Sequence, residues 1–127
     1  MKKRILLIDD DSEFVEMLAM RLEARGYKVV GASDGRSGLT KAGADKPDLI
    51  LLDIAMPDED GFWTLEELKK KSETRHVPVV MLTARRDIAA IQKAQDLGAV
   101  DYFMKPCTSD KFIDMLERYT GPAYPAF

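Results

Sequence analysis

The sequence predicts an α/β domain in which five parallel strands alternate with five helices. Short apolar runs recur along the chain, at residues 5–8, 29–30, 49–52, 77–82 and 100–104. Strands covered on both faces of a parallel sheet are continuously apolar, and each run is typical of such a strand. Helical patterns follow every run, so strand and helix alternate over the whole chain. Strict alternation of this kind predicts a parallel sheet with right-handed crossovers.

The predicted helices differ in how clearly the sequence marks them. Apolar residues recur at helical spacing in four of them: Phe14, Val15, Leu18 and Leu22 in the first, Leu65 and Leu68 in the third, Ile88, Ile91 and Leu97 in the fourth, and Phe112, Ile113 and Leu116 in the fifth. The second helix, over residues 37–44, is the weakest prediction because Gly38 and Gly43 lower its helix propensity.

Small polar residues and glycines mark the expected helix ends. The residues that suit N-caps are Ser12, Ser33 or Asp34, and Thr108, and those that suit the C-terminal ends are Gly26 and Gly98. The elements fill residues 1–120, which we expect to form one domain. Residues 121–127 contain glycine and proline and cannot continue a helix, so we expect a tail or the start of a linker.

Composition excludes several classes of protein. The chain has 127 residues, 19 Lys+Arg and 22 Asp+Glu, hence a net charge of −3, and one cysteine. A single cysteine excludes an internal disulfide and a multi-cysteine zinc site. The acidic balance gives no overall attraction to nucleic acid or to an anionic membrane. The first apolar run stops at Asp9, too early for a signal peptide or a membrane span, so a cytoplasmic location is expected.

Acidic and basic side chains follow several predicted strands. Asp9, Asp10 and Asp11 come after the first strand and Asp53 after the third. Because ligands of open parallel sheets bind beyond the carboxyl ends of the strands, we expect these residues to meet. A triply acidic turn would repel bare phosphate but suits Mg²⁺, which prefers oxygen ligands. Crowded carboxylates are costly without a cation, although for Asp11 a solvated loop position or an N-cap is the favoured interpretation.

Two further strand ends carry groups that could meet a phosphoryl oxygen. Thr83 and Ala84 end the fourth run, and Lys105 and Pro106 follow the fifth. A Lys-Pro bond directly after a strand, with a cis bond allowed, would aim the ammonium inward. The acids from Asp58 to Asp60, by contrast, are interpreted as solvated loop residues or caps.

Five motifs occur in a characteristic order and spacing. They are Leu6-Leu7-Ile8-Asp9-Asp10, then Pro47 to Asp53 with Met56-Pro57 and Asp60-Gly61, then Leu82-Thr83-Ala84, then Gly98-Ala99 to Tyr102, and finally Lys105-Pro106. With these motifs the chain resembles the receiver domain of two-component response regulators, of the chemotaxis-receiver type, over residues 2 to about 119. The resemblance implies a flavodoxin-like, doubly wound sheet of five parallel strands in the order 2-1-3-4-5.

The resemblance also implies a role for each site residue. Asp53 would accept a phosphoryl group from a histidine kinase or a histidine phosphotransfer protein. Mg²⁺ would be held by Asp9, Asp10, Asp53 and the backbone carbonyl of Ala55. The remaining groups would respond to the phosphoryl group: Thr83 through a hydrogen bond, Lys105 through an ion pair, and Tyr102 as an aromatic switch that turns inward when Thr83 moves.

Three positions are expected to modulate the lifetime of an acyl phosphate. Ala55 and Arg85 lie two residues after the acceptor and two after the threonine, positions that tune hydrolysis in receivers. Ala55 cannot position an attacking water, whereas Arg85 could shield the phosphoryl group, so we expect slow-to-moderate autodephosphorylation. Ala84 is small enough to leave the pocket open, although an alanine that favours the next helix is an equal interpretation.

A downstream effector protein or domain is expected to bind the face formed by the fourth helix, the fifth strand and the fifth helix. Ile91 is the candidate for an exposed partner contact there, but core packing is the favoured interpretation because apolar helix residues usually belong to the core. Cys107 is interpreted as a small buried hydrophobe. We expect a monomer or weak dimer without direct nucleic-acid binding.

Two other functions compete with the phosphoryl-accepting module. A phosphorylation-independent interaction or dimerisation module would have little need for the costly acidic set. A hydrolase that uses an aspartyl phosphate is disfavoured because Ala55 removes the second carboxylate of an Asp-x-Asp motif. The chain is therefore not expected to be a conventional enzyme, and at most phosphorylates itself from a donor and slowly loses the phosphoryl group.

Overall fold

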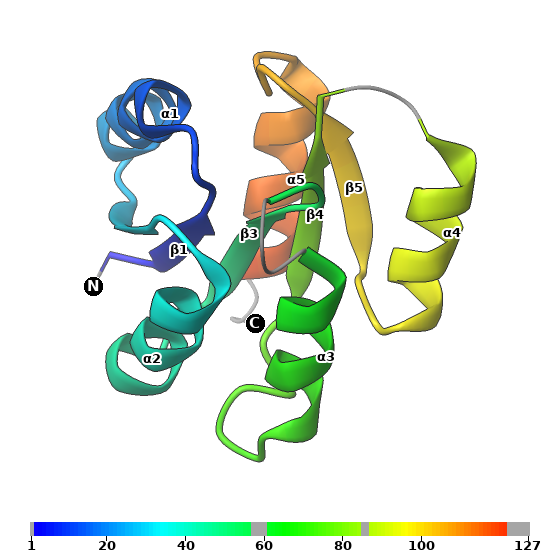
Figure 1. Cartoon of the computed structure of the whole chain (residues 1–127). Helices are drawn as coiled ribbons and strands as arrows, with labels where there is room; N and C mark the ends of the chain where they lie inside the picture. Colours follow the sequence, from blue (N-terminus) through cyan, green and yellow to red (C-terminus); the bar gives the residue numbers. More distant parts are fainter. Residues whose placement is uncertain (1, 57–60, 85–86, 122–127) are drawn as a thin grey trace.

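The computed structural model describes residues 2–56, 61–84 and 87–121. Strands and helices alternate through this part of the chain (Figure 1). The strands are β1 (Arg4–Ile8), β2 (Lys28–Ala32), β3 (Leu49–Asp53), β4 (Val79–Thr83) and β5 (Asp101–Met104). The helices are α1 (Ser12–Ala24), α2 (Gly35–Asp45), α3 (Gly61–Lys70), α4 (Ile88–Asp96) and α5 (Asp110–Thr120). None of the helices described has the length and apolar character needed to cross a bilayer.

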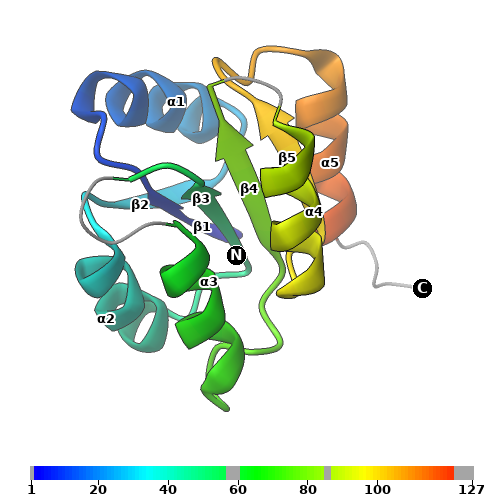
Figure 2. The same ribbon diagram turned by 45° about the vertical axis from the view of Figure 1, so that its right-hand side comes forward.

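The sheet has the predicted topology. Its order is β2-β1-β3-β4-β5, and every neighbouring pair is parallel. Helices α1 and α5 cover one face, and α2, α3 and α4 cover the other (Figures 1 and 2). This is the doubly wound architecture expected from the alternation and from the family resemblance.

Alternation of side chains along each strand divides the core into two layers. On β1, Ile5 and Leu7 pack with α1 and α5, whereas Leu6 and Ile8 pack with α2, α3 and α4. Successive side chains of a strand point to opposite faces, so a strand covered on both sides needs apolar residues at every position. Strands β3 and β4 are buried at all five positions.

The edge strands differ from this prediction. Most residues of β2 are only half-buried, and β5 has no fully buried residue. Both strands have a neighbour on one side only, so their apolar runs do not imply burial on both faces. The expectation of a fully buried strand is therefore correct for the inner strands and wrong for the two edges.

The N-terminal caps lie one residue from two of the predicted positions. Asp11 caps α1, as one of its two expected interpretations had it, although Ser12 had been named for this cap, and Ser109 caps α5, where Thr108 had been expected. A capping residue keeps an extended backbone while its side chain accepts the N–H three residues on, and Asp11 and Ser109 do both. For α2 the cap is Asp34, one of the two predicted candidates.

Two glycines lie after helices, as predicted, and a third glycine, inside α2, allows that helix to pack closely on β1. Gly26 and Gly98 follow α1 and α4 with φ of 95° and 109°, a left-handed conformation that glycine adopts without strain. Gly38 lowers the propensity of α2, yet a Cβ at this position would lie 2.6 Å from the Ile8 side chain. Packing of α2 on β1 therefore requires the residue that made this helix hard to predict.

Candidate functional site

The carboxyl ends of the inner strands bring the predicted acids together. Asp9 follows β1, Asp53 is the last residue of β3, and ligand oxygens of Asp9, Asp10 and Asp53 lie within 4.8 Å of one another. Asp9 is 1% exposed and Asp53 is 5% exposed, whereas Asp10 is open to solvent. The cluster therefore has two buried carboxylates and one at the surface.

Lys105 projects into the same cluster. Its Nζ lies 2.7 Å from Oδ2 of Asp9 and 3.7 Å from Oδ1 of Asp53. The backbone N–H of Lys105 donates to the carbonyl of Thr83 at 2.8 Å, which ties the end of β5 to the end of β4. The Lys105–Pro106 peptide bond is cis, as the sequence allowed. The inward direction predicted for this ammonium is what the structure has.

Burial and charge perturb both partners of this contact. Burial first and the charge of Asp9 second raise the pKa of Asp53 to about 6, against the opposing effect of Lys105. Burial alone would lower the pKa of Lys105, but the contact with Asp9 and the charges of Asp53 and Asp9 raise it above its ordinary value. Lys105 is thus a firmly charged ammonium, and Asp53 a carboxylate whose negative charge is costly.

The acidic cluster has the donor set of a hard divalent cation. Asp9 Oδ2 is buried and accepts no hydrogen bond of regular geometry from the described residues; its compensation is the ion pair with Lys105. Among the residues that the structure describes, the ammonium of Lys105 faces three clustered carboxylates, so negative charge is in excess there. Crowded carboxylate oxygens with such an excess fit Mg²⁺.

Short loops fix the acids in place. Asp9 Oδ1 accepts the N–H of Asp11 at 3.0 Å, and Asp53 Oδ1 accepts the N–H of Ala55 at 3.4 Å. Gly61 opens α3 close to the end of β3: its N–H donates to the carbonyl of Ile54 at 3.0 Å, and a Cβ there would collide with the backbone oxygen of Asp53. In the sequence, the Asp-Gly pair before a helix is the one indication of this close approach.

The other predicted site residues have less uniform positions. Thr83 is buried at the end of β4, and Tyr102 on β5 is half-buried against the layer formed with α2, α3 and α4. Ala55 and Ala84 are exposed beside the cluster. Predictions for Arg85 and for the acids at 58 and 60 lie outside the described residues, as does the predicted tail from residue 122 onward.

Ile91 packs in the core, the favoured of its two interpretations, and is therefore not the exposed partner contact for which it was the candidate. Ile91 is 8% exposed because it shares the inward face of α4 with Ala94, three residues later. Ile88, at the start of the same helix, is instead 76% exposed, and Val100 and Met104 near β5 are 43% and 45% exposed. Among the described residues of this face, these three are the large apolar side chains that are exposed.

Cys107 and Phe14 differ in how well the sequence described them. Burial raises the pKa of the Cys107 thiol to about 12, so this residue is the inert buried hydrophobe that was predicted. Phe14 was predicted as a core residue of α1, and it is buried there. Its ring also lies under the ammonium of Lys105, 4.7 Å from Nζ to the ring centroid, a contact that helical spacing could not indicate.

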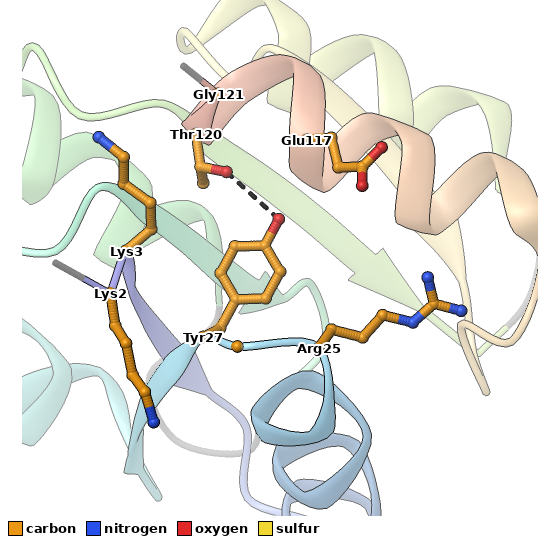
Figure 3. Close-up of a pocket in the computed structure, with 8 residues that line it drawn as sticks. Lys2, Lys3, Arg25, Tyr27, Glu117, Thr120 and Gly121 are labelled. Carbon is orange, nitrogen blue, oxygen red and sulfur yellow. Dashed lines mark hydrogen bonds between the residues drawn. The ribbon is translucent and has the colours of Figure 1, made fainter. Parts of the chain in front are cut away.

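Two hollows lie at opposite edges of the sheet. One of about 600 Å³ is bordered by Lys2, Lys3 and Arg25, with Tyr27 bonded to Thr120 through their hydroxyls at 3.3 Å (Figure 3). This hollow lies where the strands begin, far from the acidic cluster at their carboxyl ends. The other, of about 560 Å³, runs between α1 and α2 and is bordered by Asp9 and Asp10. Only the second of these two adjoins the acids.

Comparison with known proteins agrees with this geometry. The family model described as "Response regulator receiver domain" matches residues 5–117. The probable transcriptional regulator ycf27 of Cyanophora paradoxa is 42% identical over 105 residues, covering 83% of this chain and 43% of the relative. The alkaline phosphatase synthesis transcriptional regulatory protein PhoP of Bacillus subtilis is 41% identical over 106 residues, covering 84% and 43%. The chain thus spans about two fifths of the length of these relatives.

Solved structures give the same result. The chemotaxis protein CheY4 of Vibrio cholerae superposes with a TM-score of 0.88 at 28% identity, covering 94% of this chain and 99% of that one. A receiver domain of NtrX from Brucella abortus superposes with a TM-score of 0.83 at 31% identity, covering 91% and 97%. The chain therefore belongs to the response regulator receiver domain family.

Proposed function

We propose that Asp53 accepts a phosphoryl group from a phosphohistidine donor in a Mg²⁺-dependent reaction. The observation that supports this best is the convergence of Asp53 with Asp9, Asp10 and Lys105 at one edge of the sheet. Phosphoryl transfer needs an aligned nucleophile and positive charge near the transferred oxygens, and this convergence offers both.

The proposed transfer is a displacement at phosphorus. A carboxylate oxygen of Asp53 forms a bond to phosphorus while the bond from phosphorus to the donor's imidazole nitrogen breaks, and its electron pair stays on that nitrogen. With a pKa of about 6, Asp53 is mostly ionised at neutral pH and carries the required lone pair.

Cations compensate the charge of the incoming group. When bound by Asp9, Asp10, Asp53 and the carbonyl of Ala55, Mg²⁺ supplies positive charge to the phosphoryl oxygens. Lys105, already within 3.7 Å of Asp53, pairs with a second oxygen.

A conformational shift would carry the signal outward. Phosphorylation adds charge and acceptor oxygens at Asp53, which favours the conformer in which the Thr83 hydroxyl reaches them and Tyr102 turns inward. The surface that changes is α4, β5 and α5, where Ile88, Val100 and Met104 are exposed. An effector protein or domain is the expected partner of this face.

The kinase or histidine phosphotransfer protein is the partner at the acidic edge. The proposal includes both partners, the phosphoryl donor and the effector. It also includes a cytoplasmic location, a monomeric or weakly dimeric state, and no direct nucleic-acid binding by this domain. A phosphorylation-independent interaction module is less favoured, because it gives no reason to bury Asp9 and Asp53 side by side.

Intact mass spectrometry tests the proposal. The chain is incubated with acetyl phosphate and Mg²⁺, and we expect the mass gain of one phosphoryl group. No gain is expected when a chelator removes the metal before the donor is added. Asp53→Asn should show no gain, whereas the exposed control Asp87→Asn should behave as the parent chain. A gain that survives in Asp53→Asn, or no gain in the parent chain, would contradict the proposal.

A further inference from the structure

Four residues at the acidic edge form a closed circuit of contacts. Asp9 Oδ1 accepts the N–H of Asp11 at 3.0 Å, and Asp11 Oδ1 accepts the N–H of Phe14 at 3.1 Å. The Phe14 ring centroid lies 4.7 Å from Lys105 Nζ, and that nitrogen lies 2.7 Å from Asp9 Oδ2. The circuit joins the first turn of α1 to the group that follows β5.

We infer that Phe14 is a positioning residue, whose ring holds the Lys105 ammonium between Asp9 and Asp53, and that Asp11 fixes the ring through the start of α1. This rests on the proposed function, since it is the phosphoryl group on Asp53 that Lys105 has to meet.

The chemistry of the two side chains supports this. The face of an aromatic ring is electron-rich and attracts an ammonium, more strongly where water is partly excluded. The Lys105 side chain is 18% exposed, so its ammonium is largely shielded. Lysine has a long flexible stem, and a contact on a further side restricts where its charge can lie. The carboxylates of Asp9 and Asp53 attract the Lys105 ammonium, and the Phe14 ring restricts the positions that the ammonium can take.

The ring is itself held in place. Phe14 is 8% exposed and packs with Leu18 and Phe112 in the layer between the sheet and helices α1 and α5. Its backbone N–H is bound by the N-cap Asp11, which also donates to Asp9. The ring is thus attached to a rigid element at both its backbone and its side chain, as a positioning group requires.

Core packing alone would explain the burial of Phe14, so the test must separate the ring's charge distribution from its shape. Pentafluorophenylalanine at position 14 nearly keeps the shape and reverses the attraction for a cation. The matched control is the same change at Phe62, whose ring lies 4.5 Å from Lys93 Nζ, between α3 and α4 and outside the acidic cluster.

The first readout is hydrogen exchange of the Lys105 ammonium with water, measured by NMR in the metal-free protein. We expect exchange to become several-fold faster after fluorination at position 14, and in Phe14→Leu as a second variant, but not after fluorination at position 62. Unchanged exchange in both position-14 variants would overturn the inference.

The second readout is the rate of phosphorylation by acetyl phosphate with Mg²⁺. Fluorination at position 14 should slow it by about two- to thirty-fold, the range that corresponds to a cation–π contact. An unchanged rate with altered exchange would overturn the role in transfer. If the parent chain takes up no phosphoryl group, the proposed function fails, whereas the exchange experiment still decides whether the ring holds the ammonium.

Discussion

Replacing Asp53 by asparagine should stabilise the metal-free fold, although it removes the proposed acceptor. Burial and the neighbouring Asp9 raise the pKa of Asp53 from 3.8 to about 6. At 1.36 kcal/mol per pH unit, this rise means that ionised Asp53 costs the fold about 3 kcal/mol. Asparagine has nearly the same shape and no charge, so we expect Asp53→Asn to gain about 2–3 kcal/mol at pH 7.5.

The sign of the pH dependence follows from the raised pKa. The folded state holds the Asp53 proton up to about pH 6, while the unfolded state releases it near 3.8. The wild-type chain therefore gains stability from this residue as the pH falls from 6 toward 3.8, and the advantage of Asp53→Asn shrinks to nearly nothing below that range. Urea unfolding in the presence of a chelator, followed by Trp63 fluorescence, measures the difference.

A matched control separates burial from simple removal of charge. Asp11 is exposed in the same acidic turn, and asparagine can replace it as an N-cap, so Asp11→Asn should change stability by less than about 0.5 kcal/mol. If Asp53→Asn were neutral or destabilising at pH 7.5, or if its effect did not vary with pH, the electrostatic description of the cluster would be refuted.

Three further predictions concern the metal, the helix cap and the glycine below the site. Mg²⁺ at a hundredfold excess over its dissociation constant should stabilise the chain by about 2.7 kcal/mol in thermal melts, and an equal gain in Asp9→Asn would contradict the assigned cluster. Asp11→Ala should lower the free energy of unfolding by about 1 kcal/mol because α1 loses its cap, with Asp11→Asn retaining most of it; equal losses in both would argue against capping. Gly61→Ala should cost about 1–3 kcal/mol in urea unfolding, since its Cβ would meet the Asp53 carbonyl, and a neutral result would show that α3 can shift freely.

The fold and the acidic cluster were predictable for one shared reason. In a parallel sheet every strand ends at the same edge, so residues that follow separate strands in the sequence become neighbours in space. Asp9 and Asp53 are 44 residues apart in the chain. Their proximity could nevertheless be predicted once the two strands that precede them were identified.

Features that depend on the orientation of an element were not predictable in this way. Ile88 and Ile91 both fit the helical spacing of an inward face, so the sequence pattern does not tell which of them is buried. The packing of α4 decides that Ile91 is buried and Ile88 is exposed. The apolar runs of β2 and β5 resemble those of inner strands, but lie at the edges of the sheet. Phe14 has the spacing of an ordinary core residue, and its contact with Lys105 depends on how α1 lies relative to β5.

The most direct test of the account is to locate the phosphorylated residue chemically. After incubation with acetyl phosphate and Mg²⁺, borohydride reduces an aspartyl phosphate to homoserine, and peptide mapping finds the altered position. We predict homoserine in place of Asp53, dependent on both donor and metal. Homoserine at any other aspartate with Asp53 intact, or none at all, would contradict the assignment of Asp53 as the phosphoryl acceptor.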